Sequence, residues 1–423
     1  MLAVGCVEVV EKSSGRSARK RSLSGLQKAG AWACEILAGA SGSAWNLPRF
    51  SRASGGLGAS QLTLSHANEH PSLLRTSTIL TMPIFALGSN GSCQLGIGHD
   101  DDLSAPSLVN IHKLDAPITS IKAGGNHTLI LTKAGTVYAT GANSDGRCAL
   151  DTETVSISSF TPLKLPKIDF VAATWDASIF ASTQGPIFVC GSGAKGELGL
   201  DQGVVRSESL SQIPNFPPTG TQVIDLAACM GHVIVVLSNG DVYGWGNGQH
   251  GQLGTPLGVV WQPRKIDDIS FPVSRAVCGK DFTCVFGNPT EGKLQLFGLA
   301  KRDRFNIKPS TPQTLNDWID VQATWGGVYA LLSDNRLVAW GRDDHGQLPP
   351  ADLPVTAMAA GSEHMLVLTT AGKVLAWGWG EHGNCGLPTD EQRDVKGRWN
   401  ELDVGGKVQH IGAGCATSWI ITS

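Results

Sequence analysis

The sequence predicts an all-β fold, a seven-bladed β-propeller that is closed by strands from both ends of the chain. Three observations support this prediction: one unit recurs seven times, the series begins and ends inside a unit, and the composition suits short strands. Among 423 residues there are 52 Gly and 12 Trp, and only 16% are charged. Such a composition favours many short buried strands joined by tight turns over helical bundles.

The recurring unit contains a strand that ends in Gly and continues into a polar loop. Its seven copies are ALGSNGSCQLG at 86–96, ATGANSDGRCAL at 139–150, VCGSGAKGELG at 189–199, GWGNGQHGQLG at 244–254, LFGLAKRDRFN at 296–306, AWGRDDHGQLP at 339–349 and AWGWGEHGNCG at 376–386. The shared glycine stands where a positive φ or close blade packing would exclude a Cβ. The fifth copy lacks the Q-L-G ending, so its loop is either specialised or degenerate.

A second segment with alternating apolar residues precedes every copy except the first, as in IKAGGNHTLILT at 121–132. The missing partner of the first copy is IGAGCATSWIIT at 411–422, at the other end of the series. We therefore expect the first and last strands to pair, which removes the exposed sheet edges of an open array. Residues 82–423 supply about 49 residues per unit, the size of a four-stranded blade with its loops.

Residues 1–81 differ from this pattern and predict a disordered basic extension. They contain nine Lys and Arg against four Asp and Glu, with much Ser, Gly and Ala. A mitochondrial targeting segment is an alternative, although Glu8 and Glu11 lie where such segments normally lack acids. Met82 directly precedes the first strand and would be a natural alternative start, so the propeller is assigned to residues 82–423.

Charge and cysteine usage narrow the class of protein. Residues 82–423 carry a net charge of −8, from 24 basic and 32 acidic residues, which disfavours direct nucleic-acid binding. The ten cysteines form no C-x-x-C pair and are interpreted as reduced, mostly buried thiols. No segment offers the roughly 18 consecutive apolar residues of a membrane span. We expect a soluble, cytoplasmic protein, with the nucleus as a second compartment.

The repeats resemble the regulator-of-chromosome-condensation repeat family over residues 82–423. The family pattern is matched by GGNHTLILTKAGTVYATG at 124–141 and by VYGWGNGQHGQLG at 242–254. The divergent stretches are similar to the fungal α-tubulin suppressor subfamily, notably FALGSNGSCQLGIGHDDD at 85–102, VAATWDAS at 171–178, GSEH at 361–364, WGWGEHGNCG at 377–386 and GCATSWI at 414–420.

This resemblance implies a non-catalytic subunit without a cofactor. It implies a heterodimer with the small zinc-ribbon protein of diphthamide synthesis, and through that partner an indirect link to Elongator. The implied roles are support of diphthamide formation on elongation factor 2 and of Elongator-dependent modification of wobble uridines in tRNA.

Tryptophans at irregular positions are the candidate partner-binding residues. Trp175 and Trp325 replace a small residue of the repeat, and Trp379 interrupts the loop after the shared glycine. Because these loops should emerge on one face, one rim of the channel is predicted to carry Trp175, Asp176, Trp325, Trp379, Glu381 and His382. Exposed aromatic residues beside acids are typical of binding hot spots. The alternative is that the rings fill the blade interfaces, as we expect for Trp245, Trp340 and Trp377.

Histidines recur at two positions of the repeat, namely His127, His232 and His364, and His250, His345 and His382. Positions related by the ring are held apart, so these side chains are interpreted as hydrogen-bonded structural histidines and no metal site is predicted. The run from His99 to Asp102 is interpreted as a solvated acidic face in preference to a cation site, and its charge could attract a basic partner. Motifs for a nucleophile, catalytic zinc or phosphate loop are absent from the sequence, which predicts that the protein is not an enzyme.

Two other functions remain alternatives. A guanine-nucleotide exchange factor for a nuclear small GTPase would need a protruding wedge, and no blade has an obvious insertion of that kind. A UV-sensing propeller would need clustered G-W-R-H-T repeats, whereas Trp175 and Trp325 are followed by Asp176 and Gly326.

Overall fold

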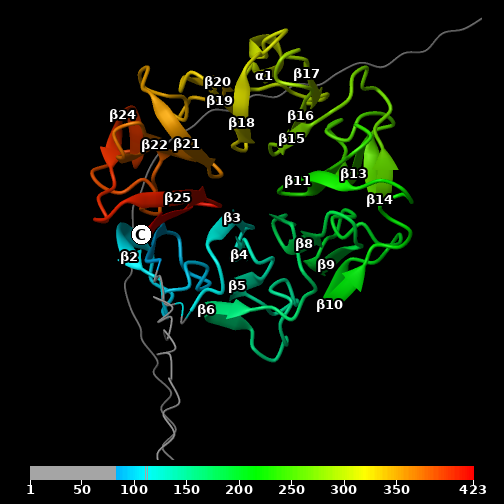
Figure 1. The fold of residues 1–423 in the computed structure, drawn as a ribbon, viewed down its shortest axis with the longest axis horizontal. Helices are drawn as coiled ribbons and strands as arrows, with labels where there is room; N and C mark the ends of the chain where they lie inside the picture. The colour runs from blue at the N-terminus through cyan, green and yellow to red at the C-terminus, as the bar shows by residue number, and fades with distance from the viewer. Residues whose placement is uncertain (1–81, 110, 112) are drawn as a thin grey trace, which may run out of the picture. The chain divides into compact units, whose positions relative to one another are not determined.

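The computed structural model describes residues 82–423 with the exception of residues 110 and 112. In this part of the chain, 26 strands and one short helix form seven antiparallel sheets around a central axis (Figure 1). The predicted all-β, seven-bladed propeller is thus confirmed. The extension predicted for residues 1–81 lies outside the described residues. No helix in the described part is long and apolar enough to cross a bilayer.

Blade one joins the two ends of the propeller, as predicted. Strand β1 (Ile84–Gly88) pairs antiparallel with β26 (Thr417–Thr422), and the register runs from Ile84 opposite Ile421 to Gly88 opposite Thr417. The outer strand β2 (Leu103–Leu108) and the inner strand β25 (Val408–Ala413) complete this sheet. In Figure 1, blue and red elements accordingly share one blade.

Four further blades have four strands each, in chain order from the channel outward. They are blade two, β3 (Ile118–Ala123), β4 (His127–Thr132), β5 (Val137–Ala142) and β6 (Ser156–Pro162); blade three, β7 (Phe170–Ala173), β8 (Ala177–Ala181), β9 (Ile187–Ser192) and β10 (Arg206–Gln212); blade four, β11 (Val223–Cys229), β12 (His232–Leu237), β13 (Val242–Gly248) and β14 (Gly258–Lys265); and blade seven, β21 (Val355–Ala360), β22 (His364–Thr369), β23 (Val374–Trp379) and β24 (Asp394–Glu401).

Blades five and six depart from the expected four strands. Each has three strands in the described residues, namely β15 (Arg275–Cys278), β16 (Phe282–Phe286) and β17 (Leu294–Gly298), and β18 (Trp318–Ala323), β19 (Gly327–Leu332) and β20 (Leu337–Gly341). In blade five the short helix α1 (Ile307–Ser310) follows β17 in place of a strand. In blade six the segment after β20 contains Pro349, Pro350 and Pro354, which cannot donate to a ladder.

The inner strands form a closed ring around the channel. Each contacts the inner strand of the next blade, from β3 through β7, β11, β15, β18, β21 and β25 back to β3. Behind them, the six residues of β12 are all buried, and its Val233 and Val235 belong to a core that extends from blade three to blade five. Burial of a valine side chain contributes about 1.5–3 kcal/mol, so the packing between blades stabilises each sheet.

The shared glycine has a positive φ in all seven copies, between 103° and 118°. In Gly88 a Cβ would lie 2.2 Å from the carbonyl oxygen of Ala416, the residue before the paired strand β26. Both the backbone conformation and the close approach therefore require glycine, as predicted.

Candidate functional site

One set of histidines joins neighbouring blades through buried hydrogen bonds. The Nε2 atoms of His127, His232 and His364 lie 2.9, 3.0 and 2.9 Å from the hydroxyl oxygens of Ser178, Thr283 and Ser418, respectively. Those hydroxyls donate to the backbone carbonyls of Arg147, Gln252 and Asn384 at 2.6, 2.8 and 2.7 Å. Because each hydroxyl gives its hydrogen to a carbonyl, Nε2 must be the donor to the hydroxyl.

These rings are held neutral, which confirms the prediction of structural histidines. Burial lowers the pKa of His127 to about 3 and those of His232 and His364 to about 4. The Nδ1 atoms have no hydrogen-bond partner, so an imidazolium would place an unpaired donor in the core.

The second set of histidines lies nearer the surface and also connects adjacent blades. His345 Nδ1 lies 2.9 Å from Asp394, and His382 Nδ1 lies 3.0 Å from Asp102. His250 is 3.7 Å from Asp281. Asp102, from the acidic run at 99–102, therefore belongs to a contact between blades.

Trp175 and Trp325 meet across one mouth of the channel. They occupy the same repeat position in blades three and six, and their ring centroids are 5.9 Å apart, with planes inclined at 46°. Both line the channel, a cavity of about 720 Å³. Backbone hydrogen bonds fix this rim. The backbone N–H of Trp175 donates to the carbonyl of Met230, and that of Trp325 donates to the carbonyl of Ser362, each over 2.8 Å.

Trp379 lines a second hollow together with Trp325. Its ring is stacked on His345, with centroids 4.9 Å apart and planes 12° from parallel. This second hollow has a volume of about 370 Å³. We call Trp175, Trp325 and Trp379 the mouth surface. Trp245, Trp340 and Trp377 are buried, as predicted.

The remaining predicted site residues are placed differently. The carboxylate of Asp176 is paired with Arg147 of the preceding blade at 2.5 Å. Glu381 and His382 are exposed on the loop after β23 and line neither the channel nor the second hollow. The structure thus brings Trp175 and Trp325 into contact and places Trp379 on the same hollow as Trp325, while Asp176 and His382 take part in contacts between blades.

Sequence reasoning missed several residues of the second hollow. They include Lys280, Arg302, Arg304, Phe305, Arg342 and Glu363. Three of them come from the irregular loop of the fifth copy, LAKRDRFN at 299–306. That irregularity was the available signal, because a loop that abandons the repeat pattern has lost its usual contacts.

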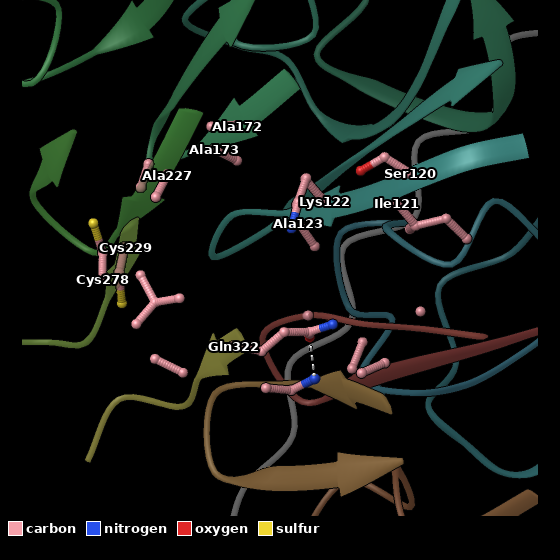
Figure 2. Close-up of a pocket in the computed structure, with 18 of the residues that line it drawn as sticks. Ser120, Ile121, Lys122, Ala123, Ala172, Ala173, Ala227, Cys229, Cys278 and Gln322 are labelled. Carbon is pink, nitrogen blue, oxygen red and sulfur yellow. Dashed lines mark hydrogen bonds between the residues drawn. The ribbon is translucent and has the colours of Figure 1, made fainter. Parts of the chain in front are cut away.

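The channel interior contains charged groups and thiols. Arg275 lies between Asp225 and Asp320, at 3.5 and 3.3 Å. Figure 2 shows Cys229 beside Cys278, and Lys122 on β3. Burial raises the pKa of both thiols well above the ordinary value, which keeps them protonated and weakly nucleophilic.

The described residues contain no group of side chains arranged to bind a metal ion. All eight cysteines of residues 82–423 are free thiols, and five of them are buried. In the same part of the chain, no three His, Cys, Asp or Glu side chains are grouped so that they could hold a metal ion.

Comparison with known proteins identifies the family. The model of the RCC1-like domain matches residues 83–420. An RCC1 repeat-containing protein of Schizosaccharomyces pombe is 29% identical, over 80% of this chain and 98% of the relative. The secretion-regulating guanine nucleotide exchange factor of Mus musculus is 28% identical, over 73% of this chain and 76% of the relative.

Solved structures share the fold. The structure of Prp20p from Saccharomyces cerevisiae has a TM-score of 0.68 at 21% identity, covering 80% of this chain and 91% of that one. Human WBSCR16 has a TM-score of 0.67 at 17% identity, covering 81% and 99%. On the match of nearly the whole propeller to the family model, this chain belongs to the RCC1-like domain family.

Proposed function

We propose that this protein is a non-catalytic binding propeller that forms a heterodimer with the small zinc-ribbon protein of diphthamide synthesis. In this role it supports diphthamide formation on elongation factor 2 and, through the partner, Elongator-dependent modification of wobble uridines in tRNA. We place this activity in the cytoplasm, with the nucleus as a second compartment. The resemblance of the divergent loops to the α-tubulin suppressor subfamily supports the choice of partner.

The observation that carries the binding function is the mouth surface. Trp175 is 37% exposed although it packs against Trp325. Indole rings supply a large contact area with little loss of conformational entropy, and they are enriched among residues that dominate binding energy. The hydrogen-bonded rim holds these rings in place before a partner arrives, which lowers the entropic cost of association.

The chemistry of the polar groups also favours binding over catalysis. The buried histidines are neutral and already hydrogen-bonded, and the channel thiols are protonated. A nucleophile needs an activating base or a lowered pKa, and the pKa values of these groups are shifted in the opposite direction.

Calorimetric titration of the full-length chain with the zinc-ribbon protein tests this proposal. We expect a one-to-one complex, and Trp175→Ala or Trp379→Ala should weaken it by about 1 kcal/mol or more, roughly fivefold in Kd. Trp399→Ala is the matched control, because Trp399 is 39% exposed but lies on the outer strand β24. Equal affinities of all three variants would move the interface elsewhere, and the absence of a complex would refute the choice of partner.

Guanine-nucleotide exchange on a nuclear small GTPase is the second candidate function. It is favoured by the relatives that are named as a guanine nucleotide exchange factor and as regulators of chromosome condensation. Release of a fluorescent guanine nucleotide from small GTPases, measured with and without the protein, separates the two candidates. Catalysed release would replace the zinc-ribbon proposal.

A further inference from the structure

The second hollow lies beside the mouth surface, and we propose that it binds an acidic, carboxylate-rich segment of a protein partner. It is lined on the side of blade five by Lys280, Arg302, Arg304 and Phe305, and it shares Trp325 and Trp379 with the mouth surface. The inference deepens the proposed binding function, on which it rests only in taking the occupant to be a protein. The identity of that protein is a separate question.

The charges that line the hollow favour an acidic ligand. Two carboxylates line the hollow: Glu363 is paired with Arg342, and Asp281 lies 3.7 Å from the ring of His250. Lys280, Arg302 and Arg304 have no carboxylate within ion-pairing distance in the part of the chain that the structure describes. The hollow therefore presents three unpaired cations in a propeller whose net charge is −8.

The neighbouring Asp303 does not neutralise the cations of the hollow, because its carboxylate is hydrogen-bonded to the backbone. It accepts hydrogen bonds from the backbone N–H groups of Ile307 and Lys308, at 2.9 and 2.8 Å. These N–H groups begin α1 and would otherwise lack partners. The loop thus turns its acid inward and leaves Arg302 and Arg304 exposed.

Aromatic rings hold some of the cations near the hollow. The Lys280 ammonium lies 5.6 Å from the ring centroid of Trp325, and the Arg304 guanidinium lies 5.3 Å from that of Phe305. A cation over a ring keeps its N–H donors available at its edge. The combination suits carboxylates that are carried on a peptide with apolar residues between them, because guanidinium groups bind carboxylates through paired hydrogen bonds.

Size and surroundings favour a protein segment over a nucleic acid. A volume of about 370 Å³ accommodates a few side chains, and the mouth surface next to it offers apolar area for the same partner. A nucleic acid would carry its phosphates beyond the hollow over a propeller with a net charge of −8, whereas a short acidic segment needs to contact only the cations of the hollow.

Fluorescence anisotropy with the full-length protein tests this inference. The probe is a fluorescein-labelled peptide that alternates Glu and Leu, and we expect saturable binding that weakens as salt is added. The double variant Arg302→Glu and Arg304→Glu should lose about tenfold or more in affinity. The matched control is Lys133→Glu with Lys167→Glu, which reverses two exposed cations. These lie beside the β4–β5 turn, at the ends of the strands that face away from the hollow. Circular dichroism checks that all variants are folded.

Several outcomes would overturn the inference. Equal affinities of the two double variants would show that the peptide responds to the net charge of the protein and not to the cations of the hollow. Equal binding of a peptide with Gln in place of Glu would remove the role of the carboxylates. Tighter binding of a single-stranded oligonucleotide that depends on Arg302 and Arg304 would replace the protein segment with a nucleic acid.

The zinc-ribbon protein provides an independent measurement. If the acidic peptide binds through Arg302 and Arg304 while the zinc-ribbon protein does not bind, the inference stands and the proposed partner is wrong. If the zinc-ribbon protein binds but the peptide does not, the partner stands and the inference is wrong.

Discussion

The loops that follow β13 in blade four and β17 in blade five occupy equivalent positions but differ in the use of their polar groups. In blade four Gln252 is buried, its side-chain oxygen accepts from the N–H of His250 at 2.9 Å, and its carbonyl accepts from Thr283 at 2.8 Å. In blade five Asp303 caps α1, and Arg302 and Arg304 have no such partners. The regular loop uses both oxygens of Gln252 for hydrogen bonds within the ring, whereas the irregular loop leaves Arg302 and Arg304 without an ion-pair partner in the described residues.

The same contrast applies to the tryptophans. Trp245 is at the regular strand position, is fully buried and donates its Nε1–H to the carbonyl of Glu197 at 2.9 Å. Trp175 stands where blade two has Gly125, and its ring lies over that glycine, since a Cβ there would be 2.6 Å from the indole. Residues that follow the repeat therefore build the disc, and residues that break it supply candidate binding groups.

The largest expected effect is a loss of folding stability at acid pH, where the buried histidines that join the blades become protonated. The pKa values of His127, His232 and His364 are lowered in the folded state to about 3, 4 and 4, against 6.5 in the unfolded chain. The unfolded state then binds more protons as the pH falls below about 6.5, so stability present above that pH is lost toward pH 4. Each histidine lowers the free energy of unfolding by up to about 1.4 kcal/mol per pH unit, so the three together lower it by up to about 4 kcal/mol per pH unit.

Urea unfolding at a series of pH values measures this slope. Burial raises the pKa values of Asp225 and Glu363, which opposes the loss at the acid end of the range. His232→Gln cannot titrate and should reduce the slope by about a third of the histidine contribution. An unchanged slope in this variant would contradict the assignment.

Removal of the two kinds of tryptophan should give the next largest difference. Trp245→Ala opens a cavity in the core and should cost about 3–5 kcal/mol in the free energy of unfolding. Trp175→Ala should cost about 1 kcal/mol or less, because the ring is 37% exposed. Thermal denaturation followed by circular dichroism compares them, and similar losses would show that the mouth surface is part of the core.

Thr283→Val tests a single contact between blades four and five. The valine keeps the shape but leaves His232 Nε2 and the Gln252 carbonyl without their shared partner, which should cost about 2–3 kcal/mol. Thr356→Val is the control, because its hydroxyl is exposed and donates to the carbonyl of Leu368 alone. Chemical denaturation measures both, and an equal loss would mean that the buried contact adds nothing specific.

The sequence allowed much of the disc to be predicted, because each unit carries its own signals. The shared glycine, the half-unit offset at the ends and the ring-related histidines depend on position within the repeat. That position can be read directly from the amino-acid sequence. The contact between Trp175 and Trp325 is not visible in this way, since it depends on how far two blades stand apart across the channel. The pairing of Asp176 with Arg147 likewise joins two different copies.

The number of strands in blades five and six also escaped prediction, because outer strands have little periodic signal of their own. The fifth loop could be recognised as irregular, but its orientation depends on Asp303, whose role becomes clear only when the amides of Ile307 and Lys308 are placed beside it. Sequence irregularity thus marked the loop as unusual, but it revealed neither the hollow nor the charges that remain unpaired there.

The smallest expected effect comes from Asp303→Asn, which weakens the cap of α1 and leaves the rest of blade five unchanged. The loss should be about 1 kcal/mol or less, because an amide oxygen can still accept one of the two N–H groups. Hydrogen exchange should quicken at the amides of Ile307 and Lys308 and stay constant at those of β16. If exchange rose throughout blade five, the cap would be supporting the whole blade, and the loop could not be treated as a separate binding element.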